Sequence, residues 1–331
     1  MKEIIFILKD GTANIDQIGG TDSYLRRLIK VIGKKKVELV YKSNTNEIIE
    51  IDNICIQRFD KILKIYGYLK KKPSAIKIIS NLNFFEKIIL LPLKKRYLLN
   101  FFYPKNLLIH LFKYIEINFF GYISIIVPSL RLKKIFNKWH KSIIWLPPII
   151  PDKYKPDNTL KRNKFSFIGR ADLRKGLKNF LYFKKKFPKY NWYISLIKID
   201  KDYNNTEIEY LLKTEKINWR DRSKFNYNIE KALIKDLQTT KVFFQPYETL
   251  DSTVDLPLLI LEAQACGCVV ISNNIDKRYL CYTSRKLNQK FNLQKFLENL
   301  PSNKNIIKCS KKIRNLYSSS HVREEFFKIV K

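Results

Sequence analysis

Short runs of β-branched and other apolar residues alternate along the chain with amphipathic stretches of helical length. This alternation is typical of βαβ units and predicts an α/β fold with parallel sheets. A helix is predicted from Thr21 to Ile32, where apolar residues recur at helical spacing. Buried strands are predicted at Ile4–Leu8, Val37–Tyr41, Ile76–Ile79, Ile88–Leu91, Leu107–His110, Ile125–Val127, Phe165–Ile168, Trp192–Ile197, Val242–Gln245 and Val269–Ser272.

A cluster of prolines divides this pattern into two parts. Pro147, Pro148, Pro151 and Pro156 fall within ten residues and are followed by a polar, charged segment, which is typical of a linker. We therefore expect a first domain at 1–150, a linker at 151–163, a second domain at 164–317 and a C-terminal helix at 318–331 that crosses back to the first domain. Two doubly wound domains facing across a cleft would hold a ligand at the carboxyl ends of their strands.

The longest apolar region, residues 107–130, is long enough to span a bilayer. Lys113, Glu116, Asn118 and Pro128 interrupt it, which favours a buried strand, a helix and a second strand over a transmembrane helix. The first residues, MKEIIFILKDG, lack a basic region and a cleavage site, so they are interpreted as a strand and not as a signal peptide. We expect a cytoplasmic protein.

Composition narrows the class of protein. The chain has 331 residues, of which 45% are hydrophobic and 14% aromatic, enough to build sizeable cores, so a disordered or fibrous protein is excluded. The formal net charge of +34 is spread evenly over both parts. Such a charge attracts nucleic acid, an anionic membrane or phosphorylated substrates. An A/T-rich genome, which would make Ile, Lys and Asn abundant together, explains the excess of lysine equally well. Five cysteines without a CxxC pair and three scattered histidines indicate neither disulfides nor a zinc site.

Three motifs could carry chemistry. In the first, DQIGGTDSYLRRLIKVI, the pair Gly19 and Gly20 lies directly before a helix. Glycines let a backbone approach a ligand closely, and a helix N-terminus favours an anion or hydroxyls. The alternative is a turn in which Thr21 or Asp22 caps the helix.

The second motif, FSFIGRADLRKGLKNFLYF, begins with a strand that ends in Gly169 and Arg170, and Lys175 with Gly176 then opens a helix. Two cations five residues apart at a strand end can both reach one diphosphate, with the Arg170 guanidinium binding two oxygens and Lys175 acting as a point charge. They would stabilise a departing nucleoside diphosphate without a metal. Two solvated cations are the alternative.

The third motif, DSTVDLPLLILEAQACGCVVIS, predicts a helix that starts at Pro257 and Leu258 and is stopped by Gly267 before a strand. Glu262 is the one acid in this apolar helix. A carboxylate there needs a partner, which the two hydroxyls of a ribose would provide; a lysine or backbone amides would serve equally. We interpret Cys266 and Cys268, which flank Gly267, as small residues packed in the interior; a metal or redox site is the less favoured alternative.

Taken in order, these three motifs resemble those of the group 1, family 4-like glycosyltransferases, which are retaining, use nucleotide sugars and have the GT-B fold of two Rossmann-like domains. The resemblance implies a first domain that binds the acceptor and a second that binds the donor. It implies that Arg170 and Lys175 bind the donor diphosphate, that Glu262 binds the ribose, and that Gly19 and Gly20 lie under the phosphate or sugar. By the same resemblance, Gly169, Pro257 and Leu258 are expected to belong to the donor site.

The sequence departs from this family at one position. The family usually carries a second glutamate eight residues before the one matching Glu262, and Val254 stands there, followed by Asp255. Either Asp255 takes this role through a shifted backbone, or the donor sugar is held differently. His110, at the end of a predicted strand, could match a histidine that faces the donor sugar in the family; an ordinary strand-end histidine is the alternative.

A competing signal is IKIDKDYNN, in which Asp200 and Asp202 follow a strand as the metal-binding carboxylates of single-domain glycosyltransferases do. Because this segment lies between two donor motifs, we interpret the two aspartates as ordinary loop residues and not as metal ligands. No metal and no cofactor are therefore expected. The LRRLIK segment and the lysine runs Lys34–Lys36 and Lys70–Lys72 could contact anionic lipid, or simply form solvated faces. No specific nucleic-acid motif is recognisable.

The sequence thus predicts a glycosyltransferase that moves a hexosyl-type sugar from a UDP- or GDP-sugar to a glycan or lipid-linked acceptor with retention and without a metal. Assembly of cell-surface polysaccharide or lipopolysaccharide, at the inner face of the cell membrane, is what the resemblance implies. Two alternatives remain: a catalytically inactive binding protein with the same fold, and a basic nucleic-acid-binding protein.

Overall fold

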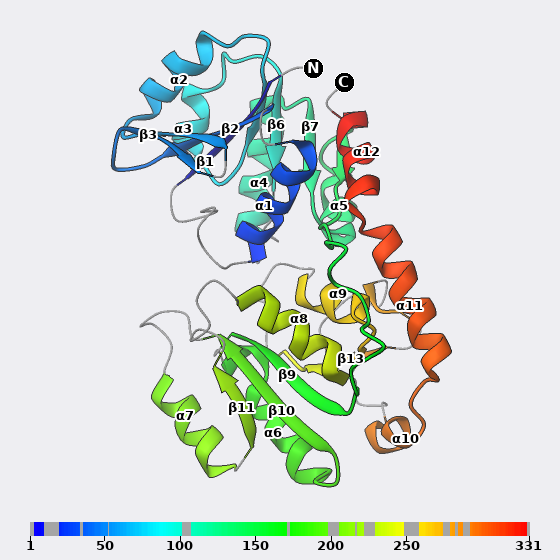
Figure 1. The fold of residues 1–331 in the computed structure, drawn as a ribbon. Helices are drawn as coiled ribbons and strands as arrows, with labels where there is room; N and C mark the ends of the chain where they lie inside the picture. Colours follow the sequence, from blue (N-terminus) through cyan, green and yellow to red (C-terminus); the bar gives the residue numbers. More distant parts are fainter. Residues whose placement is uncertain are drawn as a thin grey trace. The chain divides into compact units, whose positions relative to one another are not determined.

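The computed structural model of the chain forms two compact units (Figure 1). Unit 1 comprises Met1–Ile149 and Ser319–Lys331, and unit 2 comprises Ile150–Ser318, so the chain passes between the units twice. The residues that the structure describes are 3–9, 20–33, 36–51, 53–100, 107–170, 173–197, 205–215, 217–221, 229–247, 258–273, 279–281, 284–286 and 292–329.

Unit 1 is built on a sheet in the order β3-β4-β2-β1-β5-β6-β7-β8, in which every pair is parallel except the β3–β4 hairpin. The chain runs outward from β1 in one direction through β2 and in the other through β5, so β1 and β5 flank the point where the strand order reverses. The strands are β1 (Ile4–Lys9), β2 (Val37–Lys42), β3 (Glu47–Ile51), β4 (Ile54–Phe59), β5 (Ile76–Ile79), β6 (Arg96–Leu99), β7 (Ser124–Val127) and β8 (Ile143–Trp145).

Both faces of this sheet are covered, and the sequence of β1 shows why. Ile4, Phe6 and Leu8 belong to one core, while Ile5 and Ile7 belong to the core on the opposite face. Successive side chains of a strand point to opposite faces, so a strand buried on both must be apolar throughout. The helices of this unit are α1 (Gly20–Ile32), α2 (Ile62–Lys70), α3 (Phe84–Ile89), α4 (Leu107–Phe120), α5 (Leu130–Phe136) and α12 (Ser319–Ile329).

The last helix is part of the core of unit 1. Val322 and Phe326 of α12 are fully buried in the cluster that contains Leu28 and Ile29 of α1. Further along, Arg27 donates a hydrogen bond to the carbonyl of Ile149 (2.9 Å). The basic LRRLIK segment therefore has at least one cation, the partly buried Arg27, that is engaged within this unit.

Unit 2 has an all-parallel sheet in the order β11-β10-β9-β12-β13-β14. Its strand order reverses between β9 and β12. The strands are β9 (Lys164–Arg170), β10 (Asn191–Ile197), β11 (Asn218–Asp221), β12 (Thr240–Gln245), β13 (Val269–Ser272) and β14 (Arg285–Lys286). The helices are a short 3₁₀ turn (Leu173–Lys175), α6 (Leu177–Lys186), α7 (Asn205–Thr214), α8 (Ile229–Thr239), α9 (Leu258–Ala265), α10 (Leu293–Glu298) and α11 (Asn303–Leu316).

Most of the predicted strands and the two predicted helices near residues 21 and 258 are confirmed, but two strands were wrong. Residues 88–91 lie at the end of α3 and just beyond it, and residues 107–110 form the first turn of α4. A short run of apolar residues fits a buried strand and an apolar helix equally well, because it has no polar position to reveal its period. Residues 107–120 are one helix, so His110 does not end a strand. No described helix is long and apolar enough to cross a membrane.

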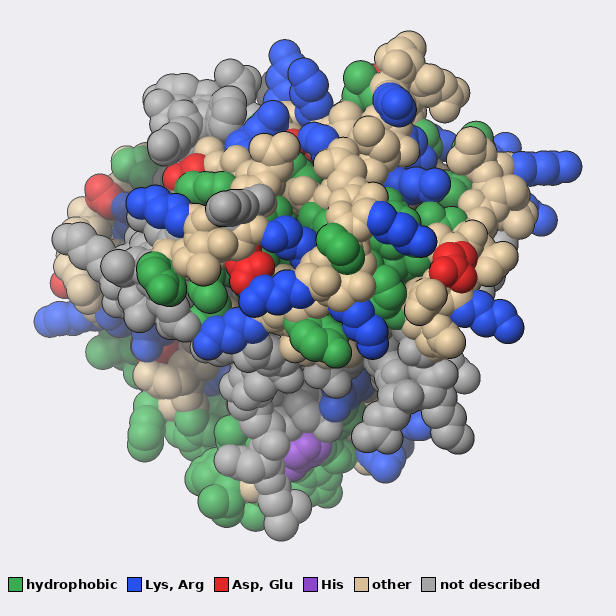
Figure 2. All heavy atoms as spheres, turned by 90° about the horizontal axis from the view of Figure 1, so that it is seen from below, with side chains coloured by type: hydrophobic (Ala, Val, Ile, Leu, Met, Phe, Trp, Pro, Cys, Tyr) green, Lys and Arg blue, Asp and Glu red, His purple; other side chains and the backbone are tan. Residues whose placement is uncertain are grey.

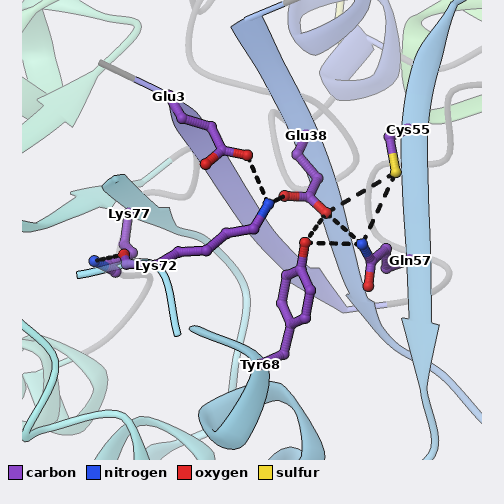
Figure 3. Close-up of polar contacts among 7 residues, drawn as sticks. All are labelled: Glu3, Glu38, Cys55, Gln57, Tyr68, Lys72 and Lys77. Atoms are coloured by element: carbon purple, nitrogen blue, oxygen red, sulfur yellow. Dashed lines mark hydrogen bonds and ion pairs between the residues drawn. The ribbon is translucent and has the colours of Figure 1, made fainter. Parts of the chain in front are cut away.

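A polar cluster joins α2 to the sheet of unit 1 (Figure 3). The buried carboxylate of Glu38 accepts hydrogen bonds from Lys72 (2.8 Å), Gln57 (2.6 Å) and the Tyr68 hydroxyl, and Lys72 also pairs with Glu3 (2.7 Å). Burial, together with the hydrogen bond to Glu38, raises the pKa of Tyr68 to about 12. Glu3 and Glu38 lie at the amino ends of β1 and β2, so the cluster is at the edge opposite to the one where parallel α/β sheets bind ligands. Its role is structural, and it already engages one cation of the run Lys70–Lys72.

Candidate functional site

The candidate site is the carboxyl edge of the sheet in unit 2. The strands are parallel, so the ends of β9, β12 and β13 lie together at this edge, next to the reversal of strand order. A Cβ added to Gly169 in β9 would lie 3.7 Å from Nε2 of Gln245, the last residue of β12. The Ser272 hydroxyl at the end of β13 donates to the carbonyl of Gln245 (2.7 Å). Open α/β sheets bind their ligands at such a point.

A buried lysine lies beside this edge. Lys175 ends the 3₁₀ turn that follows β9, and only 8% of it is exposed. Its Nζ lies 5.3 Å from the ring centroid of Tyr247, two residues beyond β12, which places the ammonium on an aromatic face. Lysine is rarely this buried. The sequence predicted Lys175 near the end of one strand, β9, and in the structure it also lies next to the end of the neighbouring strand, β12.

Gly176 explains how the two strand ends come so close. Its backbone has φ +89°, which a side chain disfavours, and it forms the N-cap of α6. A Cβ at this position would lie 1.8 Å from the carbonyl oxygen of Pro246. The same oxygen accepts a hydrogen bond from the Asn179 side chain (3.3 Å). Only glycine lets the segment 173–176 lie directly against residues 245–247.

Two buried oxygens at this edge have no hydrogen-bond partner among the described residues. They are Oε1 of Gln245, a residue that is 1% exposed, and Oδ1 of Asn273, the residue after β13. A buried polar atom without a partner costs about 1–3 kcal/mol. A ligand with hydroxyl or N–H groups would recover this cost, so both oxygens mark a place for hydrogen-bond donors. Sequence reasoning missed them; the signal was a polar residue directly at the end of each predicted strand.

Glu262 lies on α9, whose residues are almost all buried. Only 4% of Glu262 is exposed, which is unusual for a carboxylate. Helix α9 is followed by Gly267 (φ +80°), which ends it as predicted, and then by β13. Because β13 starts at the amino edge, α9 must begin at the carboxyl edge, with Leu258 as its first residue and its helix dipole positive there.

Three predicted site residues, Gly19, Asp255 and Pro257, lie outside the described residues, as do Asp200 and Asp202 of the competing acidic signal. Gly20 is the first residue of α1, and Arg170 is the last of β9, with only its backbone described. His110 is in α4, where its ring meets Trp139 edge to face at 5.5 Å. The prediction that His110 ends a strand was wrong. Its ring packs from α4 against Trp139.

The carboxyl edge of unit 1 carries polar groups that sequence reasoning also missed. Ser80 and Asn81 follow β5, next to β1, and the Ser80 amide donates to the carbonyl of Ile7 (2.9 Å). Asn81 has φ +59°, a conformation that few residues other than glycine adopt. The Ser80 hydroxyl and the Asn81 side-chain nitrogen are buried and have no hydrogen-bond partner within the described part of the chain. They form a second place where a polar ligand would be accommodated.

Two of the cysteines are packed in the interior of unit 2. Cys266 and Cys268 are buried, and burial raises the pKa of the Cys268 thiol to about 11, which keeps it protonated. Its Sγ donates to the carbonyl of Leu237 (3.2 Å). Among the described residues, no group of three or more His, Cys, Asp and Glu side chains is placed to hold a metal ion.

Solved structures similar to this one cover nearly its whole length. The sucrose-phosphate synthase of Thermosynechococcus elongatus matches with a TM-score of 0.74 at 12% identity, over 99% of this chain and 98% of the other. HepE of Anabaena, in complex with UDP, matches with a TM-score of 0.71 at 10% identity over 98% of each chain. The lipopolysaccharide outer core galactosyltransferase WaaB matches with a TM-score of 0.67 at 11% identity over 99% of each chain.

No family model matches the chain, and no curated protein matches it in sequence. At identities this low the structural likeness establishes the fold alone. The neighbours are glycosyltransferases with the GT-B fold, and the mixed α/β architecture with parallel sheets that the sequence predicted is confirmed as that fold.

The contact between Gly176 and Pro246 predicts a severe effect of one methyl group. Gly176→Ala should lower the free energy of unfolding by at least about 2 kcal/mol, because it combines a left-handed backbone with a steric overlap. Gly169→Ala is the matched control, since its methyl meets only Gln245 at 3.7 Å and should change stability by less than about 1 kcal/mol. Urea unfolding measures both. Equal stability of the two variants would show that the two segments do not touch.

Because the Gln245 side-chain oxygen has no hydrogen-bond partner among the described residues, removing it should affect stability differently from removing a glutamine that is fully hydrogen-bonded. Gln245→Leu should leave the ligand-free protein as stable as before, or more stable by about 1 kcal/mol. Gln264→Leu is the control, because its side chain accepts from the Cys281 amide (2.6 Å) and donates to the Tyr279 carbonyl (2.9 Å). It should lose about 2 kcal/mol. A comparable loss in both variants would mean that Gln245 has a structural role.

Proposed function

We propose that this protein is a glycosyltransferase that binds a nucleoside diphosphate sugar at the carboxyl edge of unit 2 and transfers the sugar to a glycan or lipid-linked acceptor. The observation that carries the proposal is that the buried Lys175 lies beside the end of β12, where the side-chain oxygen of Gln245 has no hydrogen-bond partner among the described residues. A cation buried next to unsatisfied hydrogen-bond acceptors suits a ligand that is anionic in one part and rich in hydroxyls in another. A sugar nucleotide has this composition.

The GT-B neighbours support the donor class. HepE was solved with UDP and with UDP-glucose, both of which are nucleotide ligands of the proposed kind. By analogy with the sequence motifs, Arg170 and Lys175 bind the diphosphate and Glu262 binds the ribose. Gly19, Gly20 and Gly169 leave room for the phosphate and the sugar, while Pro257 and Leu258 bring the N-terminus of α9 to the donor.

In the proposed mechanism, negative charge develops on the leaving diphosphate as the bond to the sugar breaks. Lys175, which is buried at this edge before the reaction, lowers the energy of that charge together with Arg170 and the positive end of α9. The leaving phosphate oxygen takes the proton of the acceptor hydroxyl, which places the acceptor on the same face as the departing group and retains the anomeric configuration. The proposed reaction needs no metal.

The acceptor is proposed to bind to unit 1, and the Ser80 and Asn81 groups at the carboxyl edge of its sheet support this assignment. WaaB, which matches over 99% of this chain, is a galactosyltransferase of the lipopolysaccharide outer core. We propose a related setting, the assembly of cell-surface polysaccharide or lipopolysaccharide at the inner face of the cell membrane. Asp255 is proposed to take the role of the missing glutamate at Val254.

One sequence feature favours a second candidate. Val254 removes a carboxylate that the resembling family usually has at that position. A protein that binds the sugar nucleotide without transferring or hydrolysing it would result if Asp255 does not replace this group.

Turnover of the donor tests the proposed function. Lys175→Met and Arg170→Ala should each lower kcat by about 100-fold or more, because each removes a charge that stabilises the leaving group. Lys308→Met is the control, since Lys308 is an exposed lysine of α11 in the same unit, and its kcat should be unchanged. Donor consumption is measured over a panel of UDP- and GDP-sugars, with product configuration determined by NMR.

Each outcome decides between the candidates. Turnover that falls in both site variants and not in Lys308→Met supports the transferase. Nucleotide binding without turnover in the wild-type protein supports the inactive binding protein. Turnover that is the same in Lys175→Met as in Lys308→Met would refute the assigned site.

A further inference from the structure

Helix α4 presents an apolar stripe to solvent. Leu108, Leu111, Phe112, Ile115 and Phe119 are all exposed, with Phe112 at 70% and Leu108 at 67%. Their spacing follows the helical period, so they lie along one side of the helix. Isolated exposed apolar residues are common on protein surfaces, but a contiguous stripe of large ones marks an interaction surface.

The opposite side of α4 is firmly packed, so the exposure is not that of a loosely held helix. Ile117 and Phe120 are buried in the core of unit 1. Glu116, the only acid of the helix, accepts from Lys87 of α3 (2.5 Å) and from Lys113 (2.9 Å). Burial alone would raise the pKa of Glu116, but the two lysines outweigh it and hold that pKa below its usual value. This buried ionic contact fixes which side of α4 faces outward.

The stripe continues onto α3. The Phe84 ring lies 5.9 Å from the ring of Phe119 and 6.1 Å from that of Phe85, and Phe85 is 76% exposed. We call the combined surface the α3–α4 apolar face and define it as Phe85, Leu108, Leu111, Phe112, Ile115 and Phe119.

The stretch of chain that contains this face is basic. Residues 84–141 contain eleven Lys or Arg but only two acids, Glu86 and Glu116. Glu86 is engaged in the capping box of α3, and Glu116 is held by its two lysines. Trp139 packs on His110 and Tyr114 of α4, which brings the exposed Lys138 alongside the helix. Figure 2 shows Lys and Arg side chains spread over the side of the molecule that is seen from below Figure 1, with few Asp or Glu side chains among them.

We propose that the α3–α4 apolar face docks onto the surface of an anionic lipid bilayer, with its apolar side chains among the acyl chains and the flanking lysines on the headgroups. An apolar helix face bordered by cations is the usual composition of a helix that lies in a membrane interface. A second copy of the chain fits this face less well, because each copy carries a formal charge of +34 and would repel the other.

The helix lies on the membrane and does not cross it. Its 14 residues extend for about 21 Å, which is less than the thickness of a bilayer's hydrocarbon core. The docking surface also differs from the lysine runs singled out in the sequence. Lys72 is engaged with Glu3 and Glu38 at the amino edge of the sheet, whereas the apolar face is on α3 and α4.

The position of α4 connects this surface to the proposed reaction, and in this respect the inference rests on the proposed function. The helix follows β6 and runs back to β7, so it begins at the carboxyl edge of unit 1. Ser80 and Asn81 lie at that same edge, after β5. A lipid-linked acceptor could therefore keep its lipid in the bilayer while its polar end reached these residues.

Sedimentation of the full chain with vesicles tests the docking surface. The wild-type protein should bind vesicles of 70% phosphatidylcholine and 30% phosphatidylglycerol and bind pure phosphatidylcholine far less. The double variant Leu111→Gln/Phe112→Gln should weaken binding by about 10-fold or more, because two large apolar side chains no longer enter the bilayer. The control is Ile48→Gln/Leu63→Gln, which removes two equally exposed apolar residues of unit 1 outside the face and should bind as the wild type does.

Equal vesicle binding by the two double variants would overturn the proposal, as would a dimer in sedimentation equilibrium that Leu111→Gln/Phe112→Gln dissociates while vesicle binding is absent. The thermal unfolding of each variant confirms that it is folded. The failure of the proposed function is separate: a protein that binds vesicles through this face but does not respond to any sugar nucleotide would retain the docking surface and lose the transferase.

Discussion

A parallel strand that is covered on both faces places most of its polar side chains at its ends, because a polar group buried within it is costly unless it is hydrogen-bonded. This constraint organises both units. β1 is apolar until its last residue, β9 is interrupted between Lys164 and Arg170 by only one polar side chain, Ser166, and polar groups at the ends of β5, β12 and β13 collect at the carboxyl edges of the two sheets. In unit 2, Gly176 lets the segment after β9 lie directly against the backbone of Pro246, the residue after β12. The candidate site is a consequence of how the strands are buried.

Lysine has several different roles in this chain, although its abundance suggests a general solvated surface. Lys77 is 1% exposed and donates to three backbone carbonyls near the amino end of β5, and Lys87 holds α4 through Glu116. Lys175 is buried at the candidate site. These cations are placed by the fold, whereas Lys138 is exposed and follows α5 next to Trp139, which packs on α4. Composition alone could not separate these roles.

The sequence was sufficient for features that depend on local pattern. The strands around Phe6 and Phe167, the helix stop at Gly267 and the placement of Lys175 at a strand end all follow from spacing and residue type. It was insufficient where the pattern has no polar position to set the period, as in α4, or where a group's role depends on what surrounds it. Gln245 and Asn81 are ordinary residues in the sequence; only packing reveals that each carries a buried polar atom without a partner in the described structure.

The central claim is that unit 2 binds a nucleoside diphosphate sugar without a metal, and a thermal-shift panel of nucleoside diphosphates and their sugars, with and without EDTA, tests it most directly. A ligand at 100 times its Kd should add about 2.7 kcal/mol to the free energy of unfolding. The account predicts that the series of one base, UDP or GDP, stabilises the protein and that EDTA does not change this. Stabilisation that EDTA abolishes would transfer the role to Asp200 and Asp202, and the absence of any response would contradict the account.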